Sequence, residues 1–168
     1  MCFWFVHGNR MTHPPESAVL PDFPLLPGQR LQRGVLRHLA SLGMAGIEEF
    51  TPERGLRVDV MALTPKGEVW VIECKSSLAD FRADAKWQGY LPWCDRFFWA
   101  VPPAFPRAVL PDDTGILLAD DFGAEALRAA PLTPLAGARR RALILRMAMV
   151  ASRRLAALRD PGAAISDG

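Results

Sequence analysis

The chain has 168 residues, of which half are hydrophobic, and a formal net charge of +2 at pH 7. This length fits one domain with its own core, and the hydrophobic content excludes a wholly disordered chain. No apolar run reaches membrane-spanning length, and the three cysteines and three histidines lack the spacing of a zinc site. We therefore expect a cytoplasmic protein with reduced thiols.

The composition changes at both ends of the chain. Residues 1–22 combine a short apolar run with a polar, proline-rich stretch, and they are predicted to form a flexible N-terminal segment. That apolar run is too short for a signal peptide, and Met11 would make a natural alternative start. A single domain is predicted over residues 23–160, followed by a disordered tail over 161–168.

The first predicted elements are a helix over about 29–42 and a strand over 46–51. The helix contains no Asp or Glu, and the first acidic residues after it are Glu48 and Glu49 on the strand. Alternation along a strand places Ile47 and Glu49 on one face and Phe50 on the other, which favours Glu49. The alternative is a solvated glutamate on an edge strand.

Two further strands, 57–63 and 68–76, are joined by a four-residue turn and read as a hairpin. Glu73 and Lys75 share a face, and an antiparallel hairpin brings Asp59 close to both. Buried charges of this kind are costly unless they are paired or bind a metal. The pattern is therefore consistent with a metal site and equally with a structural ion pair at the end of a strand.

A helix is predicted after Lys75, with Ser76 or Ser77 as its N-cap and Asp80 in its first turn. Polar residues further along this segment could extend toward the same site, and the alternative is a set of exposed helix residues. The supporting candidates are Lys86, Gln88 and Tyr90.

The remaining elements are strands over 96–101 and 115–119, an acidic turn over 120–123, and a long helix over about 138–159. Arginines recur along that helix. They could contact the DNA backbone or form a solvated face, and the helix could equally be one that forms a dimer. The candidates for DNA binding are Arg139, Arg140, Arg146 and Arg153.

The spacing of the charged residues carries a family resemblance. Asp59, thirteen intervening residues and then Glu73-Cys74-Lys75 resemble the motif of the PD-(D/E)xK nuclease superfamily. The longer runs 72–84, 86–90 and 94–101 resemble the MmcB-like bacterial DNA-repair family within that superfamily. The resemblance covers roughly residues 29–158, and it departs from the motif at Val58, which stands where the name-giving proline would be.

This resemblance implies an α/β fold with a restriction-endonuclease-like core. The implied order is α-β-β-β-α-β, with a mixed and mostly four-stranded central sheet, helices on both faces and a long C-terminal helix. It also implies that Asp59, Glu73 and the backbone carbonyl of Cys74 coordinate Mg²⁺ or Mn²⁺. Lys75 would orient or activate water, or stabilise charge on the phosphate.

The implied function is that of a magnesium-dependent deoxyribonuclease in bacterial DNA repair. The alternative is a catalytically silent DNA-binding or adaptor protein of the same fold. DNA is the expected partner under both hypotheses, and a second copy of the chain or other repair proteins are further partners to consider.

Overall fold

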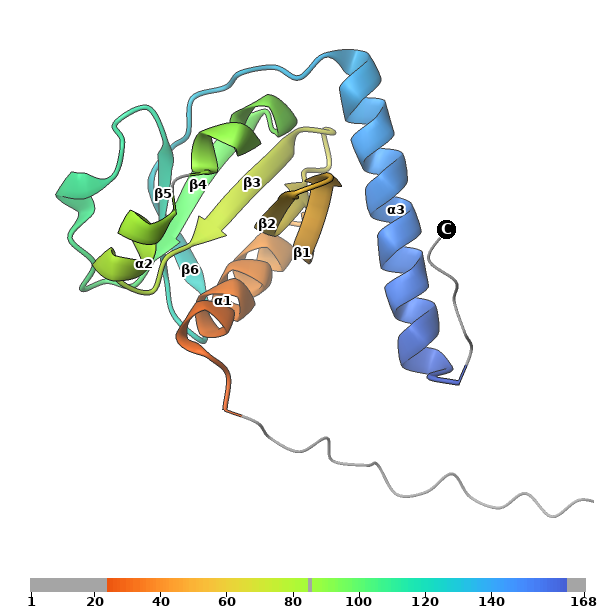
Figure 1. Ribbon diagram of the computed structural model, residues 1–168, viewed down its shortest axis with the longest axis horizontal. Helices are drawn as coiled ribbons and strands as arrows, with labels where there is room; N and C mark the ends of the chain where they lie inside the picture. Colours follow the sequence, from red (N-terminus) through yellow and green to blue (C-terminus); the bar gives the residue numbers. More distant parts are fainter. Residues whose placement is uncertain (1–23, 85, 163–168) are drawn as a thin grey trace, which may run out of the picture.

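The computed structural model describes residues 24–84 and 86–162 (Figure 1). The predicted flexible segment 1–22 and most of the predicted tail, 163–168, lie outside these ranges. The elements in chain order are α1 (Pro27–Ser41), β1 (Ala45–Glu53), β2 (Leu56–Leu63), β3 (Val69–Cys74), α2 (Leu78–Ala83), the 3₁₀ helix η1 (Trp87–Trp93), β4 (Arg96–Val101), the 3₁₀ helix η2 (Arg107–Val109), β5 (Gly115–Ala119), β6 (Ala124–Arg128) and α3 (Gly137–Arg159).

All six strands form one mixed sheet in the order β1-β2-β3-β4-β5-β6. The β1-β2, β2-β3 and β5-β6 pairs are antiparallel, whereas β3-β4 and β4-β5 are parallel. The mixed sheet and the order α-β-β-β-α-β at the start of the chain agree with the expectation, and the assignment to the restriction-endonuclease-like class stays a prediction.

The sheet has two strands more than the four implied by the family resemblance: β5, which the sequence predicts over 115–119, and β6, which it does not. The additional β6 is mostly exposed, and its sequence of Ala, Glu, Leu and Arg has little preference for extended structure. Pairing with β5 therefore makes this segment a strand, and a local pattern could not have revealed it.

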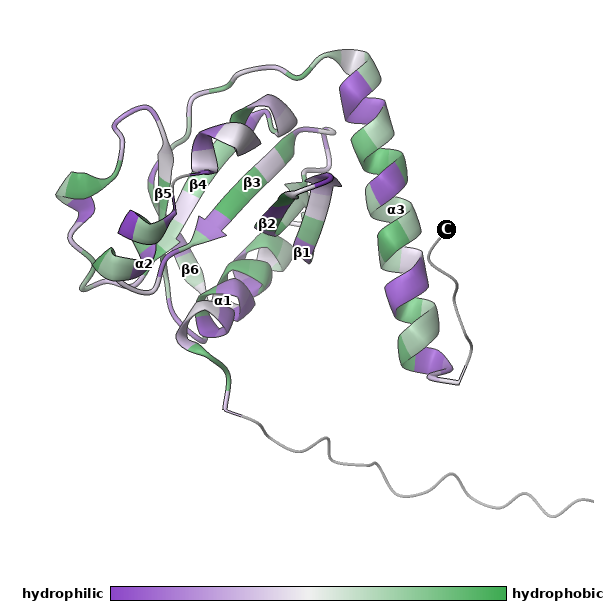
Figure 2. Ribbon diagram, viewed as in Figure 1, coloured by the Kyte–Doolittle hydropathy of each residue, from purple (hydrophilic) through white to green (hydrophobic). Residues whose placement is uncertain are grey.

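Helices cover both faces of the sheet, as expected. Leu31, Val35 and Leu39 of α1 pack on one face, against a cluster that includes Ile72 and Phe98. The opposite face is covered by η1, the segment around η2, and the first half of α3. Figure 2 shows β3 as hydrophobic along its middle and hydrophilic near its carboxyl end.

The segment after β3 differs from the single helix predicted there. Ser77 is the N-cap, and its hydroxyl accepts a hydrogen bond from the backbone N–H of Asp80 at 3.1 Å, which confirms one of the two predicted caps. The helix then ends at Ala83, and residues 87–93 form a 3₁₀ helix instead. Gly89 and Pro92 within that second segment explain the interruption, because both residues disfavour an α-helix.

The long C-terminal helix is present over Gly137–Arg159. Leu143 and Met147 pack into the core, whereas Leu155 and Leu158 are 57% and 79% exposed. Both leucines belong to the C-terminal end of α3, and Figure 1 shows this end of the helix running past the edge strand β1. Within residues 24–84 and 86–162, no helix combines the length and the apolar character needed to cross a membrane.

Candidate functional site

Asp59 and Glu73 face each other where β2 and β3 separate. The register pairs Val60 with Ile72, so the next position sets Asp59 opposite Glu73. Here side chains replace the backbone ladder: the carboxylate of Glu73 accepts a hydrogen bond from the N–H of Asp59 at 3.1 Å, and the carboxylate of Asp59 accepts one from the N–H of Cys74 at 2.8 Å. The predicted convergence of the two acids is thus present.

Asp59 and Glu73 are difficult to ionise together. Glu73 is only 2% exposed, and burial together with the nearby charge of Asp59 raises its pKa to about 8. Burial also raises the pKa of Asp59, although the hydrogen bond from the Cys74 N–H opposes this shift. Two adjacent carboxylates that resist ionisation form a place where added positive charge is stabilising.

Lys75 lies buried beside Glu73 and makes two ion pairs. Its Nζ is 3.3 Å from Glu73 Oε2 and 2.7 Å from Asp84 Oδ2. Burial lowers the pKa of Lys75, but the hydrogen bond to Asp84 and the charge of Glu73 outweigh it, so the pKa lies above its ordinary value. Lys75 is therefore an ammonium ion, suited to stabilise negative charge and not to accept a proton.

Asp84 was not predicted from the sequence to belong to the site. This residue follows the last turn of α2, and its Oδ1 also accepts a hydrogen bond from the N–H of Lys86 at 3.0 Å. The available signal was its spacing of four residues from Asp80, which would place both acids on one helical face. Asp80 itself closes the β3–α2 turn, since its Oδ2 accepts hydrogen bonds from the N–H of Ser76 at 3.0 Å and from the Ser76 hydroxyl at 3.3 Å.

Glu49 occupies an unexpected backbone conformation. Its φ is 49°, in the left-handed region that is uncommon for a residue with a Cβ. This breaks the alternation along β1, so Ile47 and Phe50 pack into the same core cluster, and the predicted placement of Phe50 on the opposite face from Ile47 is wrong. The Glu49 carboxylate instead accepts a hydrogen bond from Gln32 of α1 at 2.9 Å and pairs with Arg57 of β2 at 2.8 Å.

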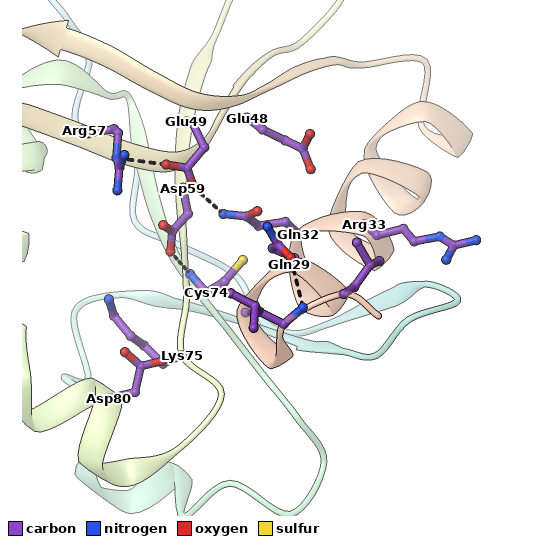
Figure 3. A pocket seen from close by; sticks show the side chains of 13 residues that line it. Gln29, Gln32, Arg33, Glu48, Glu49, Arg57, Asp59, Cys74, Lys75 and Asp80 are labelled. Atoms are coloured by element: carbon purple, nitrogen blue, oxygen red, sulfur yellow. Dashed lines mark hydrogen bonds and ion pairs between the residues drawn. The ribbon is translucent and has the colours of Figure 1, made fainter. Parts of the chain in front are cut away.

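Two clefts open at this edge of the sheet. The larger, of about 750 Å³, lies toward the start of α1 and is lined by Gln32, Glu48 and Glu49 among others (Figure 3). The smaller, of about 370 Å³, lies toward α2 and η1. Both clefts are lined by the same four charged residues: Arg57, Asp59, Lys75 and Asp80.

The three supporting candidates have different surroundings. Lys86 is exposed and Tyr90 is buried, and both line the smaller cleft. Burial raises the pKa of Tyr90 to about 12, so its hydroxyl stays protonated. Gln88 is exposed and lines neither of the two clefts.

The donors fit a hard divalent cation. Within the described ranges, no group of three or more His, Cys, Asp and Glu side chains is placed to hold a metal. Mg²⁺, however, is commonly bound through one or two carboxylates, with water and phosphate completing its shell. Asp59 and Glu73 provide two carboxylates, and Cys74 lies between Glu73 and Lys75 with its backbone carbonyl at the same strand end.

The arginines predicted to bind DNA make contacts within the protein. Arg140 pairs with Asp95 at 2.5 Å, Arg139 donates to the carbonyl of Pro92 at 2.8 Å, and Arg146 donates to the carbonyl of Pro52 at 2.9 Å. Arg153 is half-buried. Three of the four thus fasten α3 to the domain, and their role in DNA binding stays a prediction.

Comparison with known proteins identifies the family. A family model described as "DNA repair protein MmcB-like" matches residues 26–162. The chain belongs to the MmcB-like family. Membership in this family indicates a role in DNA repair, with DNA as a partner.

A solved structure is also similar to this chain. It is the SPO1766 protein of unknown function from Silicibacter pomeroyi, which is 62% identical, with a TM-score of 0.83. The match covers 85% of this chain and 99% of the other. No functionally curated protein matches the chain.

Proposed function

We propose that this protein is a metal-dependent phosphodiesterase that cleaves DNA during repair. The observation that carries the proposal is the opposed pair of Asp59 and Glu73, in which burial and mutual repulsion raise the pKa of Glu73 to about 8. A buried acid and a half-buried acid at the edge of two clefts, with a lysine beside them, form the arrangement expected of a functional site.

Asp59, Glu73 and the Cys74 carbonyl are the proposed ligands for Mg²⁺ or Mn²⁺. A bound ion would supply Lewis acidity for the attack of water on a phosphodiester bond. The protein fixes both carboxylates through hydrogen bonds to the opposite strand, at 3.1 Å and 2.8 Å, so they need little rearrangement on binding.

Lys75 is proposed to stabilise negative charge on the scissile phosphate or to orient the attacking water. Its ammonium group is held between Glu73 and Asp84, at 3.3 Å and 2.7 Å, in a buried environment where charge interactions are strong. Lys86, at the rim of the smaller cleft, is a further proposed contact for DNA phosphate.

The test is cleavage of labelled single-stranded, duplex and flap DNA in Mg²⁺, Mn²⁺ or EDTA. Wild-type protein would be compared with Glu73→Gln and Lys75→Met, and with Glu53→Gln and Lys66→Met as controls on exposed residues outside both clefts. Cleavage that requires metal, survives in the controls and is lost in both site variants supports the proposal. Cleavage that persists in EDTA, or in Glu73→Gln, contradicts it.

One observation favours a catalytically silent DNA-binding or adaptor role instead. Both oxygens of Glu73 are already engaged, one by the N–H of Asp59 and the other by Lys75, and Lys75 is also held by Asp84. If this network is purely structural, the wild type would bind DNA without cleaving it. Binding would then be unaffected by the divalent ion and by conservative changes at Glu73.

A further inference from the structure

Arg57 is a cation at the mouth of the site that the catalytic hypothesis does not use. It lies on β2 two residues before Asp59, and it lines both clefts. Its side chain is 71% exposed, in contrast to the buried Lys75. A DNA strand that passes from one cleft to the other across Asp59 therefore has to pass this guanidinium group.

Arg57 is held in place by contacts with Glu49 and, through it, with Gln32 of α1. Its Nε lies 2.8 Å from one carboxylate oxygen of Glu49, and the other oxygen of Glu49 accepts a hydrogen bond from Gln32 at 2.9 Å (Figure 3). Gln32 is only 7% exposed, so this anchor is buried. Since Nε makes the contact, both terminal nitrogens of Arg57 are left without an acceptor among residues 24–84 and 86–162.

The contacts among Gln32, Glu49 and Arg57 are better explained by orientation of the Arg57 side chain than by a gain in stability. An ion pair with so exposed an arginine contributes little to stability. Yet Glu49 keeps a left-handed backbone, with φ of 49°, to present its carboxylate between Gln32 and Arg57. Strained residues of this kind persist where the surrounding structure holds them, often at functional sites.

The charges nearby indicate which ligand Arg57 suits. Besides Arg57 and its partner Glu49, the larger cleft is lined by three carboxylates, which repel a polyanion, and by two other cations: Glu48, Asp59 and Asp80, with Arg33 and Lys75. A guanidinium group with two free terminal nitrogens matches two oxygens of one phosphate.

We propose that Arg57 binds a backbone phosphate of DNA adjacent to the one at Asp59 and Glu73, and that Glu49 holds Arg57 in position for this contact. The identity of the ligand as DNA rests on the proposed function. The contact itself requires binding only, so it can be tested separately from cleavage.

The experiment measures binding of labelled DNA by fluorescence anisotropy, in Ca²⁺ and in EDTA, over a series of salt concentrations. The variants are Arg57→Gln, Arg57→Lys and Glu49→Gln. Arg107→Gln is the matched control, because Arg107 is exposed on η2 and lines neither cleft. Thermal unfolding of each variant establishes that the fold is kept.

For Arg57→Gln we expect about tenfold weaker binding and a salt dependence reduced by the equivalent of roughly one phosphate contact. Arg57→Lys keeps the charge and loses the two-pronged geometry, so its affinity should be intermediate. Glu49→Gln should weaken binding by about threefold while keeping the wild-type salt slope, because the cation remains. Arg107→Gln should match the wild type.

Wild-type affinity and salt slope in Arg57→Gln would overturn the inference, even if the wild-type protein cleaves DNA. Conversely, if the wild type cleaves no substrate in Mg²⁺ or Mn²⁺ but Arg57→Gln binds the same DNA less tightly than the wild type does, the contact is supported and catalysis is rejected. A wild-type protein that does not bind DNA under any of these conditions would overturn both proposals.

Discussion

The carboxylates of Asp59 and Glu73 each accept a hydrogen bond from the backbone of the strand on which the other residue lies. Glu73 accepts a hydrogen bond from the N–H of Asp59, and Asp59 accepts one from the N–H of Cys74, which follows Glu73. Two hydrogen bonds to carboxylates thus replace a pair of backbone hydrogen bonds, so the strands remain connected at the point where their backbones move apart. The cost is a pair of adjacent acids in a poorly solvated place.

The first prediction concerns pH. Because the pKa of Glu73 is raised from 4.5 to about 8, its contribution to stability is full below the ordinary value and is lost as the pH rises through about 8. Metal-free protein should therefore lose on the order of 3 kcal/mol between about pH 5 and pH 9. Mg²⁺ should raise the melting temperature more at about pH 8.5 than at pH 6, since the ion must displace the proton.

This dependence is measured by thermal unfolding with and without Mg²⁺ across that range. In Glu73→Gln, both the loss of stability at high pH and the effect of the ion should shrink. An unchanged profile in that variant would assign the titration to another group.

The second prediction concerns Lys75. Lys75→Met leaves the Asp84 carboxylate without its cation and Glu73 without its hydrogen-bond donor, so the free energy of unfolding should fall by about 3 kcal/mol in the absence of metal. Urea denaturation at neutral pH measures this change. Lys66→Met, on an exposed turn, is the control and should change stability by less than about 0.5 kcal/mol. Equal effects in the two variants would refute the buried network.

The third prediction concerns the attachment of α3. The carboxylate of Asp95, which is 1% exposed, accepts hydrogen bonds from the N–H groups of Val69 and Leu135, and from Arg140 of α3. Asp95→Asn should destabilise the protein by about 3 kcal/mol, because one amide cannot accept all three bonds. Urea denaturation measures the loss, with the exposed Asp113→Asn as control.

Protonation of Asp95 is also expected to destabilise the protein at low pH. Burial alone raises its pKa, but the hydrogen bonds from Val69, Leu135 and Arg140 outweigh this effect, so the pKa lies below the ordinary value of 3.8. An acid whose pKa is lowered by folding stabilises the protein at pH values above its ordinary pKa. This stabilisation is lost as the pH falls through the pKa of the folded state. The wild type should therefore lose more stability than Asp95→Asn when the pH falls below about 4. Parallel curves would contradict this assignment.

The fourth prediction concerns the contact between α1 and the β5–β6 turn. A Cβ at Gly34 would overlap the carbonyl oxygen of Asp120 and come within 2.6 Å of that of Gly123. Gly34→Ala should therefore cost about 3 kcal/mol, since backbone atoms cannot move aside easily. Gly28→Ala on the same helix meets nothing within 4 Å and should be neutral or slightly stabilising. A neutral Gly34→Ala in thermal unfolding would show that the helix can shift.

Local sequence was sufficient to predict the elements that carry the site. The alternation around Asp59, the apolar run before Glu73 and the turn between them predict the hairpin, because strand periodicity and turn chemistry act over a few residues. Ser77 as an N-cap and the acidic turn after β5, in which Asp120 accepts hydrogen bonds from the N–H groups of Phe122 and Gly123, are local for the same reason.

Only the tertiary structure decided the contacts that join distant segments. Asp84 reaches Lys75 because the chain turns after α2, Glu49 reaches Gln32 and Arg57 through an unusual backbone angle, and Arg140 finds a buried partner in Asp95. The sequence determined which charges are present and which strand ends carry them. Packing of α1, η1 and α3 on the sheet decided which of those charges are buried, and burial sets their pKa values and their partners.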